Sequence, residues 1–317
     1  MAASDDVGRA RGPAILSIGE PMLELNQSPV EPRQFLQGFG GDTSNFCCVV
    51  ARQGGSVGYI TRLGDDAFGR RFLDLWHEEQ IDVRGVAIDP HAHTGLYFVT
   101  HSEAGHEFSY MRKGSAASRM RPEDLPLDLI DQAKFLHVSG ISQAISETAC
   151  DTVFAAVERA RAAGVAIAYD PNVRLKLWPQ ARAKAIVEAT LQYVDYFLPS
   201  FEDAQILTGL SDPDAILDRF VSMGLEQVCL KLGSRGVIVA HEGERTHFPA
   251  HRVAMVDATG AGDCFDGAFI TRIALGDSIA NAARYANAAA ALATTGYGAV
   301  APIPRPDAVY ALLETAA

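Results

Sequence analysis

Short apolar runs alternate with longer amphipathic stretches over most of the chain. In the carboxyl-terminal two thirds the alternation is regular, with apolar runs at 135–138, 165–170 and 194–198 and helical periodicity at about 146–163 and after Pro179. The runs are short enough to be buried strands, and the segments between them are long enough to be helices. Strands and helices that alternate in this way predict right-handed crossovers and a mostly parallel sheet with helices on both faces.

The amino-terminal third departs from this rhythm after one strand. Ile15–Ile18 is apolar apart from one serine and is predicted to be a buried strand of the main sheet. Residues 22–26 instead alternate apolar and polar side chains, and the extended runs 94–99 and 107–112 flank a polar stretch that contains glycine. Such a pair of runs is typical of a β-hairpin. We expect the hairpin and residues 22–37 to form a small sheet that stands off the main one.

Composition and charge exclude several classes of function. The chain has 317 residues, enough for one large α/β domain or two small ones, and a formal net charge of −12. Binding to nucleic acid or to anionic membranes needs a basic surface, so the charge argues against both. No apolar run is long enough to span a bilayer, the amino terminus is acidic where a signal peptide is basic, and the five cysteines form no C-x-x-C pair. We therefore expect a cytoplasmic protein with no nucleic-acid or membrane partner.

The stretch from Asp257 to Phe269 carries the strongest chemical signal. Gly260 and Gly262 bracket an alanine just before Asp263, and apolar residues then follow at helical spacing. The first N–H groups of a helix lack backbone partners and attract anions, and glycines let a phosphate approach them closely. A carboxylate repels phosphate, so its position here favours a catalytic role: accepting the proton of an alcohol that attacks a phosphoryl group. Without that role, the pattern would be ordinary capping chemistry.

The run Asp257-x-x-Gly260-Ala261-Gly262-Asp263 resembles the signature of the ribokinase-like (PfkB) carbohydrate kinases. This resemblance implies a three-layer α/β/α fold with a mostly parallel central sheet, in one domain over residues 1–317. Segments at about 21–38 and 92–113 would form a small β-sheet lid. It also implies ATP and Mg²⁺ as cofactors, Asp263 as general base, and the N–H groups of Gly260, Ala261 and Gly262 as donors to developing charge.

A second glycine pair precedes a predicted buried helix at residues 46–51. Gly40-Gly41 has the same backbone freedom as the later loop, although the nearby Asp42 and Asn45 suit the hydroxyl groups of a sugar better. A tight turn would explain these glycines equally well. The segment resembles the family's amino-terminal substrate motif, which implies that Gly40, Gly41 and Asn45 contact the substrate.

Nucleotide contacts are expected beyond the carboxyl ends of the strands, where sites in such sheets lie. The segment 227–239 resembles the family's strand-turn-strand that packs on the nucleotide, although alone it would be an ordinary glycine-containing turn. The resemblance assigns the following residues to the nucleotide, the last of them near the adenine: Asn172, Lys231, Gly233, Ser234, Gly236 and Asn287.

The sugar is indicated by residues 110–118, which resemble the Tyr-x-Arg-x-x-Ser-Ala-Ala segment of 2-keto-3-deoxygluconate kinases. Such a substrate has a carboxylate at one end and a primary alcohol at the other. A guanidinium offers a planar donor pair to a carboxylate, so we expect Arg112 and Arg174 to hold the acid end. Tyr97 and Tyr110 are assigned to the substrate as well.

Two alternatives stay open for these arginines. Arg112 would otherwise be a solvated strand residue, and Arg174 a partner of a neighbouring acid or of a nucleotide phosphate. Fructokinase-like relatives share the Asp-Pro-Asn-x-Arg segment that contains Arg174, so this arginine alone does not select a sugar acid.

One departure from the family concerns magnesium. Many relatives have Asn-x-x-Glu after the fifth strand, whereas this chain has Ser200-Phe-Glu-Asp203, so we assign no residue to the metal. The expected reaction is phosphorylation of the 6-hydroxyl of 2-keto-3-deoxygluconate, a sugar acid, by a homo-oligomer of two or more chains. The nearest alternative is a fructokinase or another neutral-sugar kinase of the same fold. A more distant one is a non-catalytic sugar- or nucleotide-binding regulator.

Overall fold

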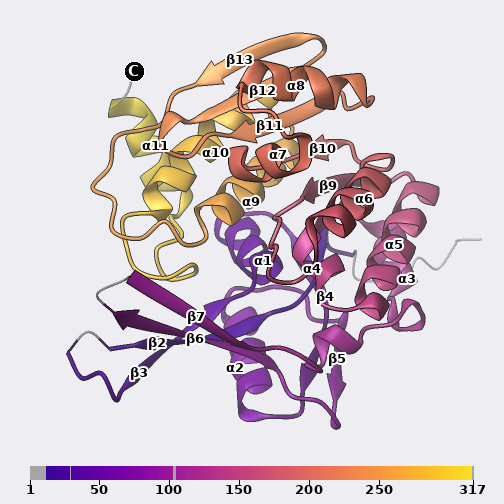
Figure 1. The fold of residues 1–317 in the computed structure, drawn as a ribbon, viewed down its shortest axis with the longest axis vertical. Coiled ribbons are helices and arrows are strands. Elements are labelled where there is room, and N and C mark those ends of the chain that lie inside the picture. Colours follow the sequence, from indigo (N-terminus) through magenta and orange to yellow (C-terminus); the bar gives the residue numbers. More distant parts are fainter. Residues whose placement is uncertain (1–11, 29, 103–104, 316–317) are drawn as a thin grey trace, which may run out of the picture.

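The computed structural model describes residues 12–28, 30–102 and 105–315 (Figure 1). A nine-stranded main sheet runs through its centre. In spatial order its strands are β13 (Glu244–Phe248), β12 (Val237–His241), β11 (Gln227–Lys231), β10 (Tyr196–Phe197), β9 (Ala166–Asp170), β8 (Phe135–Ser139), β1 (Ile15–Ile18), β4 (Val57–Gly64) and β5 (Val86–Asp89). Neighbouring strands are parallel except for the antiparallel pairs β11–β12 and β12–β13. The predicted mostly parallel sheet is thus confirmed.

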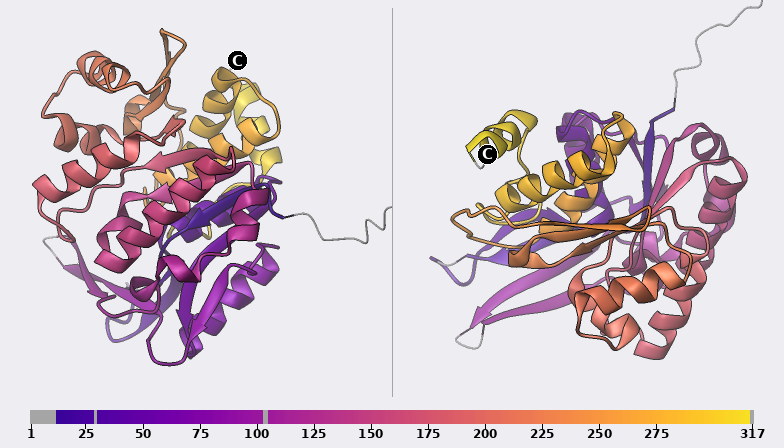
Figure 2. Two further views of the ribbon diagram at one scale, coloured as in Figure 1. Left: turned by 90° about the vertical axis from the view of Figure 1, so that its right-hand side faces the viewer. Right: turned by 90° about the horizontal axis from the view of Figure 1, so that it is seen from above.

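Two hydrophobic cores cover opposite faces of this sheet, and alternate residues of β1 show why. Ile15 belongs to one core, whereas Leu16 and Ile18 belong to the other, since successive side chains of a strand point to opposite faces. The first core packs α1 (Asp42–Arg52), α2 (Ala67–Glu78), α9 (Ala261–Ala274), α10 (Ile279–Ala293) and α11 (Pro306–Thr315). The second packs α3 (Leu127–Gln132), α4 (Gly140–Ala144), α5 (Glu147–Ala162), α6 (Gln180–Leu191), α7 (Phe201–Thr208) and α8 (Pro213–Ser222). Figure 2 shows the resulting three layers, helices on both faces of the sheet.

Two elements have other bounds in the structure than the sequence predicted. A capping side chain sets the start of one helix, and an incomplete set of strand hydrogen bonds shortens one strand. The helix expected from residue 146 begins at Glu147, since Ser146 is its N-cap and accepts a hydrogen bond from the Ala149 N–H at 3.0 Å. The strand expected over 194–198 is reduced to the two residues of β10. Beside them, the N–H of Asp195 still donates to Ile167, so the segment follows β9 without a full ladder.

A second, four-stranded sheet stands off the first, in the order β3 (Phe35–Gly40), β2 (Met22–Gln27), β6 (Gly95–Ser102) and β7 (Gly105–Met111). Figure 1 shows it projecting at the lower left. We call it the small sheet. It contains the predicted hairpin, and the register places Glu24, Tyr97 and Tyr110 directly opposite one another on neighbouring strands.

None of the described helices combines the length and the apolar character that crossing a bilayer requires.

Candidate active site

The glycine loop, residues 257–262, leads into α9. Gly260 is the N-cap of α9 with φ of 75°, and a Cβ there would lie 2.9 Å from the Ala299 side chain, so the position favours glycine twice over. Asp257 shapes the loop by accepting hydrogen bonds from the Thr259 N–H (2.9 Å) and the Gly298 N–H (2.9 Å). Ala261 begins the helix.

The first turn of α9 presents free donors. The N–H of Ala261 donates to Ala258 and that of Cys264 donates to Gly260. Between them, the N–H groups of Gly262 and Asp263 have no hydrogen-bond partner among the described residues. Gly262 is exposed, so these donors lie open at the positive end of a 14-residue helix. The geometry suits an anion such as a phosphate.

Asp263 faces α1 from this turn. Its Oδ2 accepts a hydrogen bond of 2.7 Å from Nδ2 of Asn45, which is 4% exposed. Burial, followed by the nearby charge of Asp42, raises the pKa of Asp263 to about 7, although the Asn45 bond and Lys231 act in the opposite direction. A carboxyl group with this pKa is suited to general base catalysis near neutral pH.

Asp42 lies beside this pair at the start of α1. It accepts hydrogen bonds from the Ser139 hydroxyl and from Nδ2 of Asn172 at 2.9 Å. Burial raises the pKa of Asp42, since its charged form is poorly solvated there. The preceding Gly41 has φ of 91°, and a Cβ on it would lie 2.4 Å from the Glu20 carbonyl oxygen, which explains the glycine.

Asn172 follows β9 in a conformation that is rare for a residue with a side chain. Its φ is 34°, and its N–H donates to Oδ1 of Asp170 at 3.1 Å while its side chain bonds Asp42. Strained backbone of this kind is concentrated at functional sites. The structure therefore places Asn172 between two carboxylates; its predicted contact with the nucleotide stays a prediction.

Lys231 is not free in this structure. Its Nζ donates to both carboxylate oxygens of Asp266, at 2.8 and 2.9 Å, and to Oδ2 of Asp170 at 3.3 Å. The same Nζ lies 3.7 Å from the place that a Cβ on Gly262 would occupy. Sequence analysis singled out neither acid, although Asp170 ends a strand and Asp266 lies one turn after Asp263.

Arg112 at the end of β7 is held by Glu20 and is not a solvated strand residue. Its Nε donates to Oε2 of Glu20 at 2.9 Å and its Nη2 donates to the same oxygen, while the Ser115 hydroxyl donates to Oε1. The Glu20 side chain is 0% exposed. Glu20 could not be identified from the sequence, because nothing in the local pattern links it to a residue 92 positions away.

Tyr97 occupies the face of the small sheet that carries Glu24. Its hydroxyl donates to Oε2 of Glu24 at 2.5 Å, and its ring lies 5.8 Å from that of the exposed Tyr110. A Cβ on Gly40 would lie 2.6 Å from this hydroxyl, so Gly40 makes room for the tyrosine. Burial and then Glu24 raise the pKa of Tyr97, so it stays a hydrogen-bond donor.

Arg174 is exposed, and its Nη1 donates to the Val173 carbonyl at 3.0 Å. Within the described ranges it has no carboxylate at ion-pair distance. Asp203 instead accepts a hydrogen bond from the Val173 N–H at 2.9 Å, and burial raises its pKa to about 6. In residues 12–28, 30–102 and 105–315, no group of three His, Cys, Asp or Glu side chains is arranged to hold a metal ion.

The remaining predicted nucleotide residues lie in the β11–β12 turn and on α10. Gly233 and Ser234 are exposed in this turn. Gly236 packs against the segment after β13, since a Cβ on it would meet the Phe248 carbonyl oxygen at 2.0 Å. Asn287 donates to the carbonyl of Pro249 at 2.8 Å. Gly236 and Asn287 therefore both contact the segment that follows β13.

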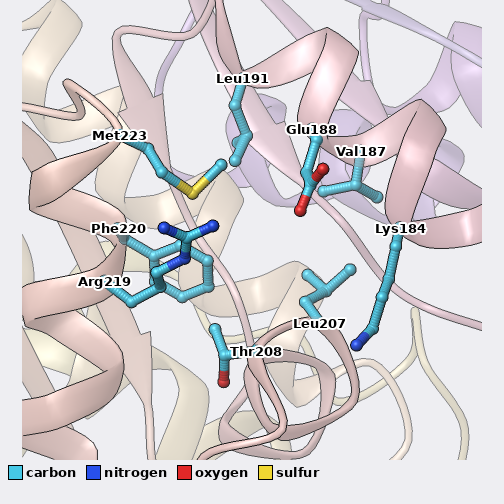
Figure 3. Close-up of a pocket in the computed structure, with 9 residues that line it drawn as sticks. All are labelled: Lys184, Val187, Glu188, Leu191, Leu207, Thr208, Arg219, Phe220 and Met223. Carbon is cyan, nitrogen blue, oxygen red and sulfur yellow. The ribbon is translucent and has the colours of Figure 1, made fainter.

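A separate pocket of about 240 Å³ lies away from these residues, between α6, α7 and α8 (Figure 3). Apolar side chains such as Val187 and Phe220 line it together with Lys184, Glu188 and Arg219. Its lining includes none of the residues described above around Asp263, so this pocket is not the candidate active site.

Comparison with known proteins gives consistent matches over nearly the whole chain. The model of the pfkB family of carbohydrate kinases matches residues 14–306. The chain is 33% identical to 2-dehydro-3-deoxygluconokinase of Thermoproteus tenax, over 95% of this chain and 94% of that protein, and 31% identical to fructokinase-2 of Oryza sativa subsp. japonica, over 96% and 94%. The crystal structure of fructokinase with bound ATP from Xylella fastidiosa superposes with a TM-score of 0.87 at 27% identity, covering 95% of this chain and 98% of that one.

Proposed function

We propose a reaction for this chain, which belongs to the pfkB family of carbohydrate kinases: transfer of the γ-phosphoryl group of ATP to the 6-hydroxyl of 2-keto-3-deoxygluconate. The observation that carries the proposal is the position of Asp263. Its carboxyl group, with a pKa raised to about 7, lies in the turn whose N–H groups are free to bind a phosphate. A base and an anion site in one helix turn are what transfer to an alcohol needs.

In this mechanism Asp263 accepts the proton of the attacking hydroxyl, and the oxygen bonds to the γ-phosphorus as the bond to the leaving ADP breaks. The N–H groups of Gly262 and Asp263 stabilise charge on the transferring group. Mg²⁺ would arrive with the phosphates of ATP, where it neutralises charge and needs no cage of protein side chains. Asn45 orients the base through its 2.7 Å bond.

The two arginines support a substrate with an acid end. Glu20 binds Arg112 through Nε and Nη2 only, so Nη1 is available to a ligand carboxylate. Arg174 is exposed and has no carboxylate within ion-pair distance among the described residues, although its charge acts on Asp42 and Asp203. The guanidinium of Arg112, 5.8 Å from the centre of the Tyr110 ring, would anchor the acid together with Arg174 and direct the far hydroxyl toward Asp263.

A neutral sugar such as fructose is the second candidate, and Glu24 favours it. This buried carboxylate faces the same side of the small sheet as Tyr97. A carboxylate there would accept hydrogen bonds from the hydroxyl groups of a sugar but would repel the carboxylate of a sugar acid. The similar identity to fructokinases agrees with this alternative.

An ADP-release assay separates the candidates. The enzyme is tested with 2-keto-3-deoxygluconate, fructose, ribose and adenosine at equal concentrations, with Mg-ATP. We expect kcat/KM for the keto acid to exceed that for fructose by at least about tenfold. Preference for fructose would overturn the substrate assignment. ATP binding without turnover of any sugar would favour a non-catalytic regulator.

We also propose a homo-oligomer of two or more chains. The small sheet exposes Phe35, Leu36 and Met111 at 39%, 60% and 56%, and apolar surface of this kind is stabilised by burial against another chain. Light scattering during size-exclusion chromatography tests it, and a single monomeric peak at micromolar concentration would contradict it.

A further inference from the structure

Lys231 is a largely buried cation whose Nζ lies 3.7 Å from the place that a Cβ on Gly262 would occupy. Its side chain is 12% exposed, and those of its partners Asp170 and Asp266 are 8% and 2% exposed. Burial acts to lower the pKa of Lys231, but Asp170 and Asp266 outweigh it, so the pKa is raised and the lysine stays charged. A buried charge is retained only when it is paired in this way.

The three residues join separate parts of the fold. Asp170 ends β9 and Lys231 ends β11, so two strands of the main sheet supply one acid and the cation. Asp266 lies on α9, three residues after Asp263 and therefore on the same side of the helix. The ion pairs thus join the second turn of α9, which follows directly on the turn that contains Asp263, to the carboxyl edge of the sheet.

We propose that Lys231 is a positioning residue for the base: its ion pairs hold the start of α9 against the sheet, and its positive charge beside Gly262 favours the ionised form of Asp263. This inference rests on the proposed role of Asp263 in phosphoryl transfer. It gives Lys231 a function toward the base, in place of a direct contact with the nucleotide.

Charged and titratable groups face Asp263 from every element around it. Asp42 of α1 and Asp170 of β9 act to raise the pKa of Asp263, as does burial, which is the largest cause. Asn45 of α1 and Lys231 of β11 act to lower it. Tyr97 of β6 and Asp266 of α9 lie nearby, the first as a neutral donor and the second paired with Lys231. Lys231 is thus the cation among these groups.

Three variants test the proposal: Lys231→Met, Asp266→Asn and the double variant. Lys231→Met removes a positive charge, so we expect the pKa seen in the pH dependence of kcat/KM for the sugar to rise by about one unit. Asp266→Asn removes the acidic partner of Lys231, whose two bonds to the ammonium favour the ionised carboxylate although burial raises its pKa, and is expected to lower the pKa of Asp263. The double variant leaves the net charge unchanged and is expected to return the pKa to within about half a unit of the wild type. Lys184→Met on α6 is the matched control and should leave the profile unchanged.

A second measurement does not depend on turnover. Carbon-13 NMR titration of carboxyl-labelled aspartate, with Asp263→Asn to assign the signal, follows the same carboxyl group directly. If the pKa of Asp263 is higher in Lys231→Met and the wild type turns over none of the sugars, the positioning role would be supported and the proposed reaction refuted. An unchanged titration together with a KM for ATP raised tenfold or more would show that Lys231 serves the nucleotide and would overturn the inference.

Discussion

Asn45 and Asp263 are 218 residues apart in sequence, and their side chains are joined by a hydrogen bond of 2.7 Å. The bond connects the helix that follows the first glycine pair to the helix that follows the second. Oδ1 of Asn45 is buried and has no hydrogen-bond partner among the described residues, so it is free to accept a hydrogen bond from a hydroxyl group of a ligand. In the proposed mechanism, one amide would thus orient Asp263 and bind the acceptor alcohol.

Replacing Asn45 tests this arrangement. Asn45→Ala removes a bond that lowers the pKa of Asp263, so we expect kcat to fall about tenfold and the pKa of the base to rise. Asn45→Asp places a second negative charge beside Asp263, so kcat at neutral pH should be lower than in Asn45→Ala. Steady-state kinetics over pH 5 to 9 provides the measurement, and an unchanged pH profile in Asn45→Ala would contradict the role.

The wild-type pH dependence follows from the same carboxyl group. Because the base works in its ionised form and its pKa is about 7, kcat/KM for the sugar should rise about tenfold per unit below pH 7 and level off above it. The profile is measured with Mg-ATP saturating at each pH. A profile that is already flat between pH 5 and 8 would exclude a base with this pKa.

The ion pair of Arg112 with Glu20 predicts a selective effect on the sugar acid. Arg112→Lys keeps a positive charge for Glu20 but loses Nη1, the donor proposed for the ligand carboxylate, so we expect KM for the keto acid to rise tenfold or more with little change in kcat. KM for fructose should change less than about threefold. Arg119→Lys, at an exposed arginine paired with Asp89, is the control. Equal effects on both sugars would exclude a carboxylate contact.

The buried carboxylate of Asp263 should also lower the free energy of unfolding at neutral pH. Its pKa is about 7 in the folded protein and near 3.8 when unfolded, so between these values the folded state binds more protons. The free energy of unfolding therefore falls as pH rises through this interval. Asp263→Asn should raise Tm by a few degrees at pH 8 and by less at pH 5, as measured by calorimetry. The exposed Asp307→Asn in α11 is the control; a gain that is the same at both pH values would refute the linkage.

Local sequence pattern was enough for the parts of the site that one segment specifies. Gly260 and Asp263 belong to a single helix start, where backbone conformation and free donors follow from neighbouring residues. The small sheet was predictable from alternation and a hairpin turn, and the parallel sheet from the order of strands and helices. Bounds were less predictable: β10 is short because Asp195 and its neighbours follow β9 outside the ladder.

Contacts between distant segments could not be predicted in the same way. Glu20 reaches Arg112, and Asp42 reaches Ser139, across about a hundred residues with no shared pattern. Lys231 was assigned to the nucleotide from the resemblance of residues 227–239 to the family's strand-turn-strand, and its burial between Asp170 and Asp266 depends on how three elements pack. Long-range ion pairs are properties of the folded arrangement, so a single sequence does not reveal them.

Single-turnover phosphoryl transfer by Asp263→Asn tests the central claim most directly. With Mg-ATP and the preferred sugar both saturating, we expect the rate constant to fall at least about a thousandfold, because the base acts in the transition state. Sugar affinity, measured by calorimetry on the same preparation, should stay within about tenfold of the wild type. A transfer rate within tenfold of the wild type would contradict the role of Asp263 as the general base.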